Sequence, residues 1–188
     1  MTVKTDYARF DIHDELTAPA GSERLLKSIT TSGGEVSKLV GVLAGSPATL
    51  RAFARLRSEL HAGDLPPATA IRIGLAVAER RGDGYSVAQH ARSARLSGIG
   101  LDEISQARGF ASGEPKEGAL LAFLKGTIEA DGHPPHHLLE EAREAGWTDE
   151  QLLEALGEAA LQEFQSHVAN AAGLPQDQID ASVLPAAA

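Results

Sequence analysis

The sequence of 188 residues contains no cysteine. Disulfide bonds, thiolate nucleophiles and thiolate metal ligands are therefore all excluded. Aromatic residues make up only 4% of the chain, so the core must be built from Leu, Ala, Val and Ile, a composition that favours helices over strands. No apolar run reaches the roughly 20 residues that a membrane-spanning helix requires. These absences predict a protein packed from helices, without thiol chemistry.

Basic residues are in the minority, because 17 Lys and Arg stand against 26 Asp and Glu and give a net charge of −9. Contacts with nucleic-acid phosphates require clustered Lys and Arg. The N-terminal segment MTVKTDYARFDIHDEL also lacks the apolar stretch of a secretory signal. We therefore expect a cytoplasmic protein with no nucleic-acid partner and no membrane partner.

The hydrophobic pattern predicts an all-α protein, because apolar residues recur with helical spacing and no segment alternates as a strand would. We expect an N-terminal arm over residues 1–20, a single domain over 21–175 and a loose C-terminal tail over 176–188. The expected helices cover approximately 22–29, 36–43, 47–62, 68–81, 86–97, 103–108, 115–131, a segment following residue 135, and 149–172.

The stretch from Ile71 to Ile99 organises the rest of the chain. It reads as an apolar helix, a break at Gly82-Asp83-Gly84, and a second helix that ends at Gly98. Asp83, Ser86 and His90 are three and four residues apart, so they lie on or near one side of the second helix. This row of polar side chains is the candidate site.

Within this stretch, LAVAERRGDGYSVAQH resembles the signature of the carboxymuconolactone decarboxylase family, which includes the alkylhydroperoxidase D-like proteins. That signature is a Glu, eleven residues, a Cys, two residues, a Cys, three residues and a His. His90 is retained, Asp83 and Ser86 stand at the two cysteine positions, and Ile71 stands at the position of the relay Glu. The flanking helices are also similar, so that the resemblance covers roughly residues 20 to 180.

The resemblance implies an alkylhydroperoxidase D-like helical fold with a central helix–turn–helix, assembled into homo-trimers or homo-hexamers. Peroxidase-type members of the family reduce hydroperoxides with the cysteine pair, using His and Glu as a proton relay. Decarboxylase-type members act on a lactone acid without that pair. Since this chain has no thiol to attack a peroxide or to resolve a sulfenic acid, the thiol peroxidase mechanism is excluded.

The candidate catalytic residues are His90, Asp83, Ser86 and Glu79. His90 is expected to point inward and to act as a general base, oriented by Asp83 or Glu79. The alternative is a buried histidine that is merely hydrogen-bonded. Ser86 with His90 and Asp83 could form a hydrolase triad, but no Gly-x-Ser-x-Gly elbow is present. Capping of the second helix explains Asp83 and Ser86 better.

Other polar residues have simpler interpretations. The segment from Asp131 to His137 holds three histidines, but side chains adjacent on a helix diverge, and a solvated turn explains the segment better than a metal site. On the last helix, His167 is interpreted as a packing or oligomer contact, and Glu158 and Glu163 are expected on the polar side. No cofactor and no metal are expected.

Two hypotheses about function remain open. The first is a cofactor-free lyase or isomerase type of chemistry, in which His90 acts as acid or base on a small organic acid or lactone. The second is a non-catalytic oligomeric binding or scaffold protein with a degenerate site. A pocket beside His90 with a second ionisable group within reach would favour the enzyme, whereas a packed site with His90 bonded to backbone would favour the scaffold.

Overall fold

The structure is a computed structural model that describes residues 9–31 and 36–175. The described residues form nine α-helices and no β-strand, which confirms the all-α prediction. None of these helices is both long enough and apolar enough to cross a membrane. The helices are α1 (Ala20–Thr31), α2 (Lys38–Leu43), α3 (Pro47–His61), α4 (Pro67–Arg80), α5 (Gly84–Leu96), α6 (Leu101–Arg108), α7 (Pro115–Glu129), α8 (His136–Glu144) and α9 (Asp149–Ala172).

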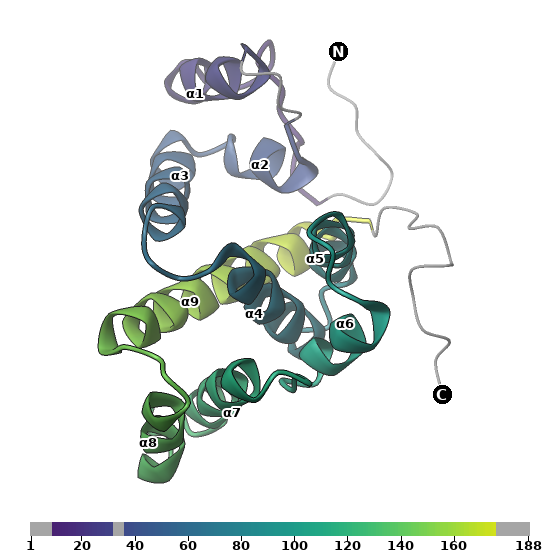
Figure 1. The fold of residues 1–188 in the computed structure, drawn as a ribbon. Coiled ribbons are helices and arrows are strands. Elements are labelled where there is room, and N and C mark those ends of the chain that lie inside the picture. Colours follow the sequence, from purple (N-terminus) through teal and green to yellow (C-terminus); the bar gives the residue numbers. More distant parts are fainter. Residues whose placement is uncertain (1–8, 32–35, 176–188) are drawn as a thin grey trace.

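Helix α4 lies at the centre and packs against α5, α6 and α9, as Figure 1 shows. Its sequence is apolar almost all round, and Ile73, Leu75 and Val77 are fully buried. A helix that is hydrophobic on every side belongs inside a protein, so the sequence-based prediction of a core helix is confirmed. On one side of this centre lie α7 and α8, and on the other lie α1, α2 and α3.

Local signals set several helix boundaries. Ser46 caps α3 by accepting a hydrogen bond from the backbone N–H of Thr49, and a proline follows at the first helical position. Thr148 and Gln151 form a capping box at the start of α9, a pairing that their three-residue spacing in the sequence predicts. Gly98 follows the end of α5 with φ +79°, a left-handed conformation that favours glycine. These boundaries match the sequence-based predictions.

The N-terminal region differs from expectation at one point. The first helix was expected from about residue 22, with Ser22 as its cap, but α1 begins at Ala20, and the Ser22 hydroxyl donates a 2.7 Å hydrogen bond to the carbonyl of Ala44. Buried hydroxyl groups are normally hydrogen-bonded, and the partner of Ser22 is the carbonyl of the residue that caps the end of α2. The preceding segment contacts the domain, since the N–H of His13 donates to the carbonyl of Gly41 over 3.0 Å.

Three sequence-based expectations concern segments outside the described residues. The first part of the N-terminal arm (1–8), the expected break at 32–34 and the C-terminal tail (176–188) all lie there. The division of the chain into arm, domain and tail therefore stays a prediction.

Candidate functional site

The turn between α4 and α5 positions the second helix of the motif. Asp83 is the N-cap of α5, and its Oδ1 accepts a 3.1 Å hydrogen bond from the backbone N–H of Ser86. The Asp83 side chain is only 1% exposed, and its Oδ2 has no partner among the described residues. Asp83 therefore has the predicted capping role. Ser86 supplies the N–H for this cap and does not cap the helix itself.

His90 follows on α5 and lies against α4. A Cβ added to Gly74 of α4 would lie 2.6 Å from both ring nitrogens of His90. Contacts that short do not occur between real side chains, so the imidazole occupies the space that any larger residue at position 74 would need. The inward orientation expected for His90 is therefore present, and it depends on a glycine in the facing helix.

The hydrogen-bond partner of His90 comes from α9. His90 Nε2 and Gln162 Oε1 are 2.9 Å apart, and Gln162 Nε2 donates to Glu158 Oε1 over 2.6 Å. Because the Glu158 carboxylate can only accept, the Gln162 amide must turn its NH₂ toward Glu158 and its oxygen toward His90. His90 Nε2 is then the donor, and the neutral ring carries its lone pair on Nδ1. No hydrogen bond reaches Nδ1 from any described residue.

Burial controls the charge of His90. Desolvation of the ring lowers the pKa of His90 below its ordinary value of 6.5, and this outweighs the hydrogen bond to Gln162 and the nearby charge of Asp83, which both favour the protonated form. The positive charge of Arg57 lowers the pKa further. At neutral pH the imidazole is therefore uncharged and able to accept a proton.

A cavity of about 530 Å³ borders His90. Its wall includes Ser86, Glu158 and Gln162 beside apolar side chains from α3, α4 and α5. About half of the residues that line the cavity are polar or charged, and its volume is within the range of small-molecule sites. Ile71, which stands at the position of the family's relay Glu, also lines the cavity. A second ionisable group thus lies beside His90, but it is Glu158 from α9.

Among the described residues, none of Asp83, Glu79 and Ser86 forms a hydrogen bond with His90, so the expected orienting role of Asp83 or Glu79 is not observed. Glu79 forms an ion pair with Arg108 of α6, with 2.9 Å between Oε2 and Nε, and is absent from the cavity wall. Ser86 lines the cavity, but no hydrogen bond joins it to His90 within the described part of the chain. The site therefore brings Ser86 and His90 to one cavity, without the hydrogen bond that a Ser-His dyad needs.

Sequence reasoning placed the inner face of α9 incorrectly. Glu158, expected on the polar side, is only 3% exposed, whereas the large apolar side chain of Phe164 is 36% exposed. The buried face carries a polar row at four-residue spacing, Glu158, Gln162 and Ser166. This four-residue spacing can be recognised in the sequence, because residues four apart lie along one line of a helix.

The remaining polar candidates lie away from the cavity. His167 is exposed, and Glu163, also expected on the polar side, pairs with Arg81 and is largely shielded. His136 pairs with Glu140 on the exposed surface of α8, with 3.3 Å between Nδ1 and Oε1. Across the described ranges, no group of three or more His, Asp or Glu side chains is arranged to hold a metal ion.

Two crystal structures resemble this fold. One is an alkylhydroperoxidase AhpD core, an uncharacterized peroxidase-related protein from Ralstonia eutropha JMP134, with a TM-score of 0.77, 21% identity and coverage of 92% of this chain and 93% of that chain. The other is an uncharacterized peroxidase-related protein from Silicibacter sp. TM1040, with a TM-score of 0.77, 16% identity and coverage of 95% and 96%. No protein-family model and no curated protein matches the sequence. The chain therefore has the alkylhydroperoxidase AhpD-core fold.

Proposed function

We propose that this protein is a cysteine-less relative of the carboxymuconolactone decarboxylase family in which His90 performs acid–base chemistry on a small organic acid or lactone. The observation that carries the proposal is the environment of His90. Its Nε2 forms a hydrogen bond with the side chain of Gln162, and its Nδ1 has no hydrogen-bond partner among the described residues. The residue also lines a cavity of about 530 Å³. A histidine with only a structural role would be expected to have both ring nitrogens hydrogen-bonded.

The proposed reaction begins with proton abstraction. Nδ1 of neutral His90 takes a proton from the carbon next to the carboxyl or lactone carbonyl, and the electron pair of the broken C–H bond moves to the carbonyl oxygen. The imidazolium then returns the proton to the same or to another atom of the substrate. Gln162 accepts from Nε2–H throughout and is in turn held by Glu158, so these two residues are positioning residues.

Thiol peroxidase chemistry is not part of the proposal. The two similar crystal structures are described as peroxidase-related, but this chain has no cysteine at any of its 188 positions. We expect no thiol-dependent consumption of hydroperoxide by the purified protein, and such turnover would contradict the argument from the sequence.

Deuterium exchange tests the proposal directly. A panel of small carboxylic acids and lactones is first screened for a rise in melting temperature, because a ligand that binds only the folded state stabilises it. Compounds that bind are then incubated with the protein in D₂O, and loss of the α-proton signal is followed by ¹H NMR. We expect exchange with the wild type and with His167→Gln, which changes an exposed histidine on α9, and a loss of at least a hundredfold with His90→Gln.

Two outcomes would count against an enzyme. If no compound stabilises the wild type, the small-acid hypothesis is wrong. If compounds bind but exchange is absent, or equally fast in His90→Gln, the non-catalytic binding protein becomes the better description.

We also propose that the chain assembles with itself, as a homo-trimer or homo-hexamer. Large apolar side chains are exposed on several helices, including Leu96 at 81% and Leu153 at 68%, and such residues are enriched where copies meet. Light scattering coupled to size-exclusion chromatography gives the mass in solution. A monomer at micromolar concentration would contradict this expectation.

A further inference from the structure

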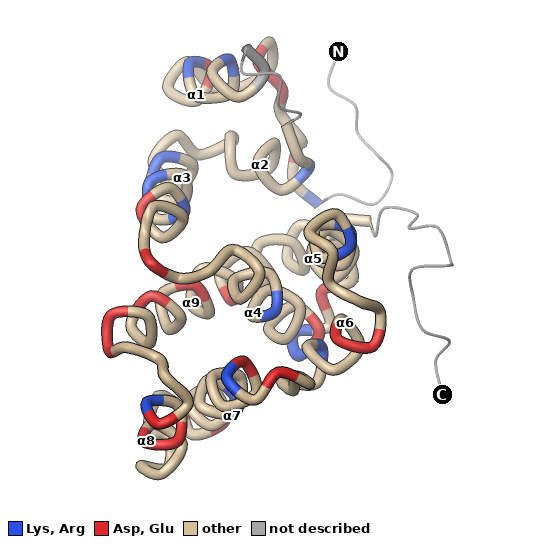
Figure 2. The backbone as a smooth tube through the Cα atoms, in the orientation of Figure 1, with Lys and Arg blue, Asp and Glu red and all other residues tan. Residues whose placement is uncertain are grey.

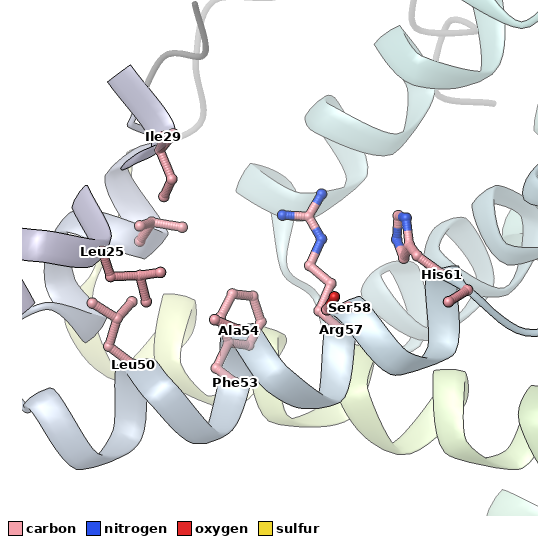
Figure 3. A pocket seen from close by; sticks show the side chains of 10 residues that line it. Leu25, Ile29, Leu50, Phe53, Ala54, Arg57, Ser58 and His61 are labelled. Carbon is pink, nitrogen blue, oxygen red and sulfur yellow. The ribbon is translucent and has the colours of Figure 1, made fainter. Parts of the chain in front are cut away.

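A second cavity, of about 450 Å³, is lined by residues of α1, α2 and α3 (Figure 3). It shares wall residues from these helices with the cavity at His90, namely Ile29, Val40, Phe53, Arg57 and His61. Because these residues line both spaces, the two cavities adjoin along this wall; we call them together the groove, and the shared wall at Arg57 the junction. The chemistry proposed for His90 does not by itself explain why the groove extends so far beyond the imidazole.

One end of the second cavity is apolar. Leu25 and Ile29 of α1 face Leu50 and Phe53 of α3 across it, as Figure 3 shows, and Val40 of α2 completes the wall. No acidic or basic group lies among these five side chains. A hydrocarbon chain could lose its contact with water there without stranding a polar atom of the protein.

The other end carries the positive charge of Arg57. Arg57 and His61 are one helical turn apart, and their side chains project from α3 in the same direction (Figure 3). Arg57 has no ion-pair or hydrogen-bond partner within the described ranges. Its neighbour Arg55 instead lies near Glu59, with 4.0 Å between Nε and Oε1. The arginine that faces the groove is thus the one whose guanidinium is left available.

The charge of α3 contrasts with that of the whole protein. The chain carries a net charge of −9, yet α3 contains three arginines and one glutamate, and Figure 2 shows basic residues gathered along this helix. Glu158 is the one acidic residue among the described residues that line the groove, and its carboxylate accepts a hydrogen bond from Gln162. The junction therefore favours an anion in a protein whose overall charge repels anions.

We propose that Arg57 binds the carboxylate of a linear aliphatic monocarboxylate whose hydrocarbon chain occupies the apolar cavity between α1, α2 and α3. This inference rests on the proposed function, because it names the class of acid that the His90 cavity receives. A guanidinium forms paired hydrogen bonds with a carboxylate. With the chain in the apolar cavity and the carboxylate at the junction, the carboxyl end of the acid faces the cavity at His90.

Isothermal titration calorimetry with defined probes tests the inference without turnover. The probes are octanoate, butyrate and octan-1-ol, each titrated into the full-length protein. We expect octanoate to bind at least tenfold more tightly than octan-1-ol, because a hydrogen bond to a charged group contributes more than a neutral one. Octanoate should also exceed butyrate, by about fourfold for each added CH₂ that is buried.

Matched variants on one helix identify the binding residue. Arg57→Gln should weaken octanoate binding at least tenfold and leave octan-1-ol binding unchanged, whereas Arg55→Gln should leave both unchanged. The two arginines are two positions apart on α3, and both are exposed, so either variant should retain the wild-type melting temperature. Equal octanoate binding by Arg57→Gln and wild type, or equal affinity for octanoate and octan-1-ol, would overturn the inference.

Failure of the inference is distinguishable from failure of the proposed function. If deuterium exchange on another acid depends on His90 while octanoate binding does not depend on Arg57, only the inference is wrong. If octanoate binds through Arg57 but no compound exchanges its proton, the inference holds and the chemistry at His90 is wrong.

Discussion

The imidazole of His90 lies directly against Gly74, so that a Cβ at position 74 would be 2.6 Å from both ring nitrogens. Helix α5 can hold a histidine at this depth only because α4 has no side chain there. The contact fixes the ring from one side, while the hydrogen bond to Gln162 fixes it from another. Together they orient the ring beside the cavity.

The first prediction concerns Gly74. Replacing a helical glycine with alanine normally stabilises a protein by up to about 1 kcal/mol, but Gly74→Ala should destabilise it by about 1–3 kcal/mol, because the methyl group displaces His90. Chemical denaturation measures the difference. Gly118→Ala in α7 is the control, since its Cβ would meet its nearest atom at an ordinary 3.5 Å. Equal stabilisation by both variants would show that the ring does not rest on Gly74.

The second prediction concerns the orientation of the His90 ring. Gln162→Leu removes the acceptor at Nε2, and since the bond to Gln162 favours the protonated ring, the pKa of His90 should fall further. The variant also leaves Glu158 without its donor, which should cost about 1–3 kcal/mol of stability. Long-range ¹H–¹⁵N NMR spectra should show Nε2–H in the wild type and a mixture of tautomers in the variant. Spectra showing Nδ1–H in the wild type would contradict the assigned network.

The third prediction concerns pH. The pKa of His90 should lie below 6.5 in the folded protein, chiefly because of desolvation, and Arg57→Gln should raise it by removing a nearby positive charge. Titration of the His90 Cε1 proton by NMR measures both values. A wild-type pKa above 6.5, or a fall in the variant, would refute this description of the site.

The same shift has a consequence for stability. Well above pH 6.5 the ring is neutral in both the folded and the unfolded chain, so it contributes no pH dependence. As the pH falls below 6.5 the unfolded chain binds a proton that the folded protein does not, and the free energy of unfolding falls toward the lowered pKa, by at most about 1.4 kcal/mol per pH unit. Denaturation of the wild type should show this extra slope relative to His90→Gln. Parallel curves would mean that the pKa is unchanged on folding.

The fourth prediction concerns the ion pair between Glu103 and Arg72, which we expect to stabilise the fold without affecting ligand binding. Glu103 of α6 pairs with Arg72 of α4, with 2.7 Å between Oε1 and Nε, and it accepts hydrogen bonds from Ser112 and from the N–H of Gly113. Glu103→Gln leaves Arg72 without a charged partner in a largely buried position, which should cost about 3 kcal/mol. Ligand binding should persist, because neither residue lines the groove.

Glu129→Gln on α7 is the matched control for this change. Glu129 is exposed, so its replacement should alter stability by less than about 0.5 kcal/mol. Equal melting temperatures for Glu103→Gln and Glu129→Gln would show that the Arg72–Glu103 pair contributes nothing to stability.

Much of the fold follows from local sequence signals. Ser46 and Thr148 cap the helices that were expected after them, and the apolar residues of α4 predicted a buried helix. Such signals act over one or two turns, so they can be read without knowing the tertiary structure. The capping role of Asp83 was predictable for the same reason.

The partners of His90 were not predictable in the same way. Asp83 and Glu79 were the expected partners because they are near His90 in the sequence, but the bond goes to Gln162, which is 72 positions away. Glu79 instead meets Arg108 because α6 packs against α4. The pairing of charged groups from different helices depends on the angle and position at which the helices pack. The hydrophobic pattern of each helix does not determine that packing.

The sequence by itself determined that this protein has no thiol chemistry, that it is all-helical and that His90 follows a capped turn, because composition and short-range hydrogen bonds decide these points. The tertiary structure alone decided that Gly74 makes room for the imidazole, that α9 supplies Gln162 and Glu158, and that Arg57 faces the same groove. These relationships arise from the packing of helices that are distant in the chain, where close approach and burial select one arrangement among many that the sequence pattern permits.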